Sequence, residues 1–154
     1  MNSLAEQVAP EGVGSIFLYT HEAHPGELYP HLTSMEQKLR HARDLRDVLG
    51  VTRPILVDAL DGACHRAYGS MPNMVWIFMR SGIPIYKSDW TDAASVANAL
   101  AYFLDVTQRR RNGERLAPFR VERVDFRRQD RAVFDEGLAR NGPKAVREFH
   151  EAFG

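Results

Sequence analysis

Two short apolar runs on either side of a helical pattern constrain the fold most strongly. The runs SIFLYT at 15–20 and PILVDAL at 54–60 are apolar on both faces of an extended chain and rich in β-branched residues. This pattern is typical of strands buried in an α/β sheet. Between them, a helical pattern begins at a cap residue, Thr33 or Ser34, and continues to Leu49. The chain therefore predicts an α/β domain.

The remaining elements extend this alternation. They are a short helix at 61–69, strands at 73–80 and 83–88 joined as a hairpin, a helix from Asp89 or Thr91 through Leu104 and as far as Arg111, an extended stretch at 118–127, and two short helices separated by Gly142-Pro143. The order is that of a thioredoxin-like domain, with a mixed sheet and flanking helices. We expect this domain at 1–106 and an Arg-rich extension at 107–154 that packs on the same domain or on a partner chain.

Charge is balanced over the whole chain but divided along it. The 154 residues contain 20 Lys and Arg and 20 Asp and Glu. Between Thr107 and Arg131, nine arginines face four carboxylates, which leaves eleven basic and sixteen acidic residues elsewhere. Such runs usually face water, and an anionic ligand or partner is the alternative. Nucleic acid is not expected as a partner, because the pI is about 7.0.

Targeting and redox signals are few. No apolar run approaches the roughly 18 residues that a membrane helix needs, and the first 14 residues do not resemble a signal peptide. We therefore expect a cytoplasmic protein without a membrane partner. Cys64 is the only cysteine, so no disulfide can form within the chain. It lies near the start of a short predicted helix, and we expect a small buried side chain there rather than a reactive thiol.

The stretch YTHEAHPGE at 19–27 follows the first predicted strand and holds the candidate catalytic groups. Glu22 and His24 are two residues apart, so they would project to the same side of an extended chain. His41 flanks the apolar stripe of the next helix and can point toward the strand end. A carboxylate beside an imidazole is typical of acid–base catalysis. The alternative is a polar turn whose side chains satisfy backbone groups.

A metal site is a further alternative for the same stretch. His21, His24 and His31, with Glu22 or Glu27, are residue types that bind zinc, copper or iron. Their spacing is not diagnostic, since His21 and His24 would face opposite sides of a continuing strand. We therefore expect neither a metal nor another cofactor.

Three longer stretches, taken in order, resemble the iodothyronine deiodinases and their bacterial redoxin-like relatives over about residues 15 to 104. They are FLYTHEAHPGE, LRHARDLRDVL and PILVDALDGACHRAYGSMPNMVWIFMRSGIPIYK. The most specific matches are Glu22-Ala23-His24, His41, Asp58 with Tyr68-Gly69, and Pro72.

The resemblance implies an active site at the end of the first strand. It assigns Glu22, His24 and His41 to catalysis. It also implies a cis Met71–Pro72 peptide bond facing the site. Tyr19, His21, Met71 and Pro72 are the residues expected to contact a small-molecule ligand, which the Arg-rich tail would favour as an anion.

The chain also departs from the family. In the family, a strand, a turn bearing cysteine or selenocysteine and a helix precede the strand that matches 15–20, whereas here only fourteen residues do, none of them cysteine. This degenerate active site implies acid–base chemistry or ligand binding without deiodinase or peroxidase activity. The alternatives are a non-catalytic thioredoxin-fold subunit and a metal-dependent enzyme. We expect the missing central strand to be replaced by 119–126 of the same or a second copy, with a homodimer favoured, or by a partner protein.

Overall fold

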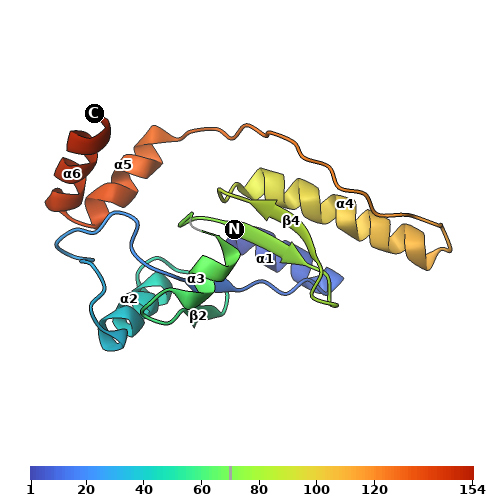
Figure 1. Cartoon of the computed structure of the whole chain (residues 1–154), viewed down its shortest axis with the longest axis horizontal. Helices are drawn as coiled ribbons and strands as arrows, with labels where there is room; N and C mark the ends of the chain where they lie inside the picture. The colour runs from blue at the N-terminus through green and yellow to red at the C-terminus, as the bar shows by residue number, and fades with distance from the viewer. Residues whose placement is uncertain (70) are drawn as a thin grey trace. The chain divides into compact units, whose positions relative to one another are not determined.

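A computed structural model describes residues 1–69 and 71–154 and has a mixed α/β fold (Figure 1). The described residues form six α-helices and two small sheets of two strands each. They divide into two compact units, which are described separately. Unit 1 comprises Met1–Pro72 and Gln129–Gly154, and unit 2 comprises Asn73–Arg128. The predicted boundary after residue 106 falls within a helix of unit 2.

Unit 1 is built on the expected strand–helix–strand pattern. Strands β1 (Phe17–Tyr19) and β2 (Ile55–Val57) pair in parallel, with Leu18 opposite Leu56. Helix α2 (Met35–Asp47) connects them and begins where the Ser34 hydroxyl accepts a hydrogen bond from the Gln37 N–H at 3.1 Å. This side-chain cap satisfies one of the donors that a helix start leaves free.

Four more α-helices belong to unit 1: α1 (Asn2–Val8), α3 (Ala63–Tyr68), α5 (Arg131–Arg140) and α6 (Pro143–Phe153). A 3₁₀ turn, Ala9–Glu11, follows α1. As the sequence predicts, Pro143 opens α6, where its missing N–H costs nothing.

Unit 2 is a hairpin followed by a long helix. Strands β3 (Val75–Phe78) and β4 (Pro84–Ser88) pair antiparallel, and Gly82 adopts the positive φ of 82° that their turn requires. Helix α4 (Ala93–Arg111) starts where the Asp92 carboxylate accepts a hydrogen bond from the Ser95 N–H. Residues 114–130 beyond it form neither helix nor strand.

One sequence-based expectation about the sheet is not met: the four predicted strands are present but shorter, and they form two separate two-stranded sheets instead of one. Residues 119–126 join neither sheet of their own chain, so no described strand continues the hydrogen bonding beyond β1 or β3. Completion of the sheet by a second copy or a partner protein stays a prediction. The described part of the chain contains no cis peptide bond, so the Met71–Pro72 bond is trans, and the expectation of a cis bond there is wrong.

No described helix combines the length and apolar character needed to cross a membrane.

Candidate functional site

Three of the predicted site residues meet at the end of β1. The buried Tyr19 hydroxyl donates a short hydrogen bond to Glu22 Oε1 and lies 3.3 Å from Nδ1 of His41. His41 comes from α2, is also buried, and places Nδ1 3.6 Å from the same carboxylate oxygen. The Tyr29 ring packs edge-on against His41 at 5.1 Å. Tyr19, Glu22 and His41 are called the acid–base cluster below.

The environment of the acid–base cluster keeps the proton on the Tyr19 hydroxyl. Burial, followed by the hydrogen bond to Glu22 and its negative charge, raises the pKa of Tyr19 far above its ordinary value. Tyr19 therefore stays protonated at neutral pH and acts as a hydrogen-bond donor. The Glu22 side chain is 18% exposed and that of His41 is 3% exposed. Glu22 is therefore the member of the pair that a ligand reaches more readily.

A second group of buried polar side chains lies on α2 and around the start of α3. Lys38 is only 1% exposed, and its ammonium donates a hydrogen bond to the Ala59 carbonyl at 2.9 Å. The Asp58 carboxylate accepts hydrogen bonds from the backbone N–H groups of Ala59, Cys64 and His65 at 2.7, 3.0 and 2.9 Å. This carboxylate thereby holds the first turn of α3.

Burial affects the pKa values of both charged side chains of this group, Asp58 and Lys38. It would raise the pKa of Asp58, but the three backbone hydrogen bonds and the nearby Lys38 prevail, and the pKa lies below its ordinary value. Burial lowers the pKa of Lys38, against the attraction of Asp58 and Asp61. Lys38 and Asp58 therefore attract each other electrostatically within unit 1, while the hydrogen-bond partner of the Lys38 ammonium is the Ala59 carbonyl.

His21 and Met71 both contact His65, the residue whose backbone N–H donates to Asp58. The His21 and His65 rings are 4.9 Å apart, and His65 Nε2 is 3.0 Å from the Met71 carbonyl oxygen. Burial of the His21 ring, together with His65 and Lys38, lowers the pKa of His21, so this imidazole is neutral at pH 7. Pro72 is exposed and follows Met71 in the trans form.

His24 does not join Glu22 and His41, although the sequence pattern placed it beside them. The chain bends at Ala23 and His24, ahead of Pro25, instead of continuing extended. The His24 ring packs edge-on against Phe134 of α5 at 5.8 Å and Phe149 of α6 at 5.5 Å. Its carbonyl accepts a hydrogen bond from the Asn141 side chain at 2.6 Å. His24 thus anchors the loop to the C-terminal helices.

Gly26 and Glu27, at the end of YTHEAHPGE, also contact the C-terminal helices and the turn between them. Both carboxylate oxygens of Glu27 accept a hydrogen bond from the Lys144 N–H, at 2.9 and 2.8 Å, at the start of α6. That hydrogen bond holds the pKa of Glu27 below its ordinary value. A Cβ at Gly26 would collide with the Asn141 carbonyl oxygen, so only glycine fits. The opening half of the stretch thus forms the polar site, and the second half forms an anchor.

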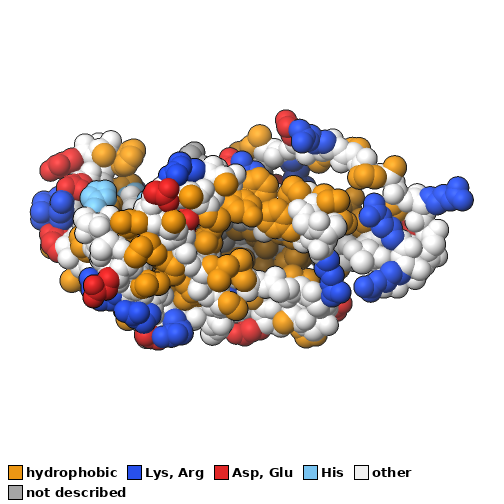
Figure 2. Space-filling model, turned by 60° about the horizontal axis from the view of Figure 1, so that its bottom comes forward, with side chains coloured by type: hydrophobic (Ala, Val, Ile, Leu, Met, Phe, Trp, Pro, Cys, Tyr) orange, Lys and Arg blue, Asp and Glu red, His pale blue; other side chains and the backbone are white. Residues whose placement is uncertain are grey.

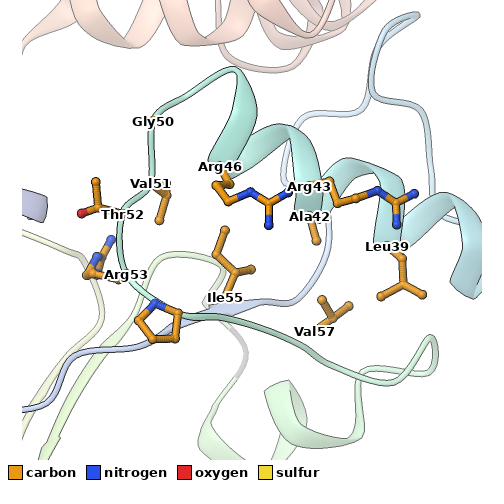
Figure 3. A pocket seen from close by; sticks show the side chains of 11 residues that line it. Leu39, Ala42, Arg43, Arg46, Gly50, Val51, Thr52, Arg53, Ile55 and Val57 are labelled. Atoms are coloured by element: carbon orange, nitrogen blue, oxygen red, sulfur yellow. The ribbon is translucent and has the colours of Figure 1, made fainter.

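A groove of about 700 Å³ lies elsewhere in unit 1, between α2 and β2 (Figure 3). Leu39, Ala42, Ile55 and Val57 line it with apolar surface. Three arginines also line it: Arg43, Arg46 and Arg53. No predicted site residue is among its lining residues, and the sequence reasoning did not anticipate it.

The metal alternative finds no suitable ligand set in the described residues. His21 and His24 contact different parts of unit 1, and His31 is exposed. Over residues 1–69 and 71–154, no three His, Cys, Asp or Glu side chains are arranged to hold a metal ion. Cys64 is half-buried on α3 and lies outside the acid–base cluster.

Comparisons with known proteins add no assignment, since no protein-family model, no curated protein and no solved structure matches this chain.

Proposed function

We propose that this chain is a deiodinase-like, thioredoxin-related protein that binds a small molecule at the acid–base cluster and moves a proton there. One observation carries the proposal. The Tyr19 hydroxyl, the Glu22 carboxylate and Nδ1 of His41 come from β1, the following loop and α2, and they converge within 3.6 Å of one another. A scaffold alone gains little from gathering such groups, because partly buried charges cost free energy.

The geometry supports different roles for the three groups. The protonated Tyr19 donates to one oxygen of Glu22, which orients the carboxylate and leaves its other oxygen able to accept a proton from a ligand. Glu22 is therefore the proposed general base. His41 lies behind it as a positioning group that can stabilise the pair during proton transfer.

The exposed groups around Glu22 favour a neutral ligand with proton donors. Glu22 and the neutral His21 both offer acceptors, whereas the ammonium of Lys38 is engaged by the Ala59 carbonyl. The sequence-based expectation of an anionic ligand depended on the Arg-rich extension, most of whose arginines belong to unit 2, whereas the acid–base cluster belongs to unit 1. We propose a small hydroxyl- or amide-bearing substrate.

A ligand screen tests the proposal while the substrate is still unidentified. Saturation-transfer NMR would compare a set of neutral hydroxyl- and amide-bearing fragments with a matched set of carboxylates. We expect neutral fragments to bind the wild type and to lose binding in Glu22→Gln and Tyr19→Phe. The control variant, His31→Gln, changes an exposed histidine outside the acid–base cluster and should bind like the wild type. Equal binding to wild type and Glu22→Gln would exclude Glu22 as the ligand contact.

Activity provides the second measurement once a bound fragment suggests a substrate. Loss of a general base typically lowers the rate by about 10²–10⁴-fold. We expect that loss in Glu22→Gln, with KM changing far less than kcat. A Glu22→Gln variant that keeps full turnover would contradict the proposed role.

A further inference from the structure

The segment 119–126, FRVERVDF, exposes large apolar side chains in a way that isolated surface residues do not. Phe119, Val121, Val124 and Phe126 are 82, 72, 80 and 92% exposed, and the segment is neither helix nor strand. Four such side chains within eight residues form a concentrated apolar surface, which marks interaction sites in soluble proteins.

The pattern of this segment suits a strand with apolar side chains on both faces. In an extended chain, Phe119 and Val121 point to one face, whereas Val124 and Phe126 point to the other. Each face also carries two charged residues, as is usual for a strand at the edge of a sheet. The segment therefore suits an edge position in which both faces have a neighbour to pack against.

The outer edge of β1 offers a place for such a strand. The Phe17 N–H donates to Pro54 and the Tyr19 carbonyl accepts from the Asp58 N–H, so both residues turn their backbone groups toward β2. The N–H and C=O of Leu18, between them, must point to the opposite edge. That edge is not paired with any described strand. The sheet has two strands, whereas three or more are usually needed for a sheet to be stable on its own.

Charge favours a second copy as the occupant. Unit 1 carries ten Lys and Arg against fourteen Asp and Glu, whereas 107–128 carries eight arginines against three carboxylates. Figure 2 shows basic side chains gathered where α4 ends in Figure 1. Each copy thus holds both an open strand edge on an acidic unit and a basic extended segment with apolar side chains.

We propose that residues 119–126 of one copy pair with the β1 edge of a second copy, and that the exchange is reciprocal, which gives a closed two-fold dimer. The added strand would lie beside β1, whose last residue is Tyr19, and would complete the sheet that supports the acid–base cluster. The interface forms whether or not Glu22 acts as a base.

Mass measurement of the full chain tests the dimer. Light scattering coupled to size exclusion, from about 1 to 200 µM, should give a dimer that weakens as NaCl rises from about 50 to 500 mM, because salt screens the opposite charges. Val121→Asp should raise the dissociation constant of the dimer roughly 30-fold or more, since it replaces a valine that the dimer would bury with a charged residue. The matched control is Val48→Asp, which changes a valine that is 68% exposed after α2 and should leave the dimer intact.

Hydrogen exchange tests the pairing itself. We expect the Leu18 amide to be protected in the wild type and to lose protection in Val121→Pro, which removes a backbone donor from an unpaired segment. A monomer at 200 µM would overturn the proposal, as would a dimer insensitive to both Val121 variants. Protection of 119–126 in a monomer would show instead that the segment pairs within its own chain.

Discussion

Replacing Asp58 and replacing Lys38 should have very different effects on stability. Asp58→Ala removes the acceptor of three backbone N–H groups at the start of α3, and it removes the negative charge that attracts the buried ammonium of Lys38. Because buried donors left without an acceptor cost about 1–3 kcal/mol each, the variant should lose about 3–5 kcal/mol in free energy of unfolding. Lys38→Met keeps the volume and leaves Asp58 satisfied by the backbone, so it should cost no more than about 1 kcal/mol.

Urea denaturation at pH 7, followed by circular dichroism, measures both variants and their combination. If the charge left on Lys38 accounts for part of the cost, the double variant should be more stable than Asp58→Ala alone, by about 1–2 kcal/mol. The pH dependence provides an internal check. The folded-state pKa of Asp58 lies below its unfolded value, so its stabilisation is present above about pH 4 and disappears as pH falls through the folded-state pKa. Asp58→Ala should lose that part of the pH dependence.

Two outcomes would refute this reasoning. A cost below about 1 kcal/mol for Asp58→Ala would mean that water replaces the carboxylate easily and that the group is not buried in solution. A cost for Lys38→Met equal to that of Asp58→Ala would mean that the ammonium, and not the carboxylate, organises the turn before α3.

Three further predictions concern single positions. Gly26→Ala should lower stability by about 1–3 kcal/mol, because the methyl group meets the Asn141 carbonyl; Gly14→Ala, with open space around its Cβ, should not lower the melting temperature and serves as the control. Tyr19→Phe should cost about 0.5–2 kcal/mol by removing a partly buried hydrogen bond, and an unchanged urea midpoint would contradict the described contact. Cys64→Ser should leave ligand binding unchanged, and wild-type protein should show no peroxidase or deiodinase turnover with thiol reductants; inactivation by alkylation of Cys64 would reverse this.

Much of the secondary structure follows from local patterns, because caps and apolar periodicity act within a few residues. Ser34 and Pro143 mark helix starts in the structure as they do in the sequence, whereas α4 is capped by Asp92, one residue after the predicted Thr91. The pairing of the strands could not be predicted, since it depends on which segments lie next to one another. The four predicted strands therefore appear, but as two sheets and not one.

The candidate site was predicted in part, for reasons that can be traced to single residues. The resemblance pointed to Glu22 and His41, and the structure brings both to Tyr19. His24 was misplaced because an extended chain was assumed where the chain bends at Ala23 and His24. Lys38 was missed, although it stands three residues after Met35 and four before Ala42, on the face that α2 buries. A charged residue at such a position is a usable signal for a buried polar contact, here the hydrogen bond from Lys38 to the Ala59 carbonyl.

The anchor between YTHEAHPGE and the C-terminal helices has a consequence for biosynthesis. The Asn141 contact with His24 and the Lys144 contact with Glu27 each join residues 117 positions apart. A ribosome that has released residues 1–128 has already supplied β1, α2 and β2, but the loop after Glu22 has no partner until α5 and α6 emerge. Contacts of such long sequence separation form late and slow folding. The contacts that position Glu22, with Tyr19 and His41, are therefore available to the nascent chain well before the loop that follows Glu22 is anchored by α5 and α6.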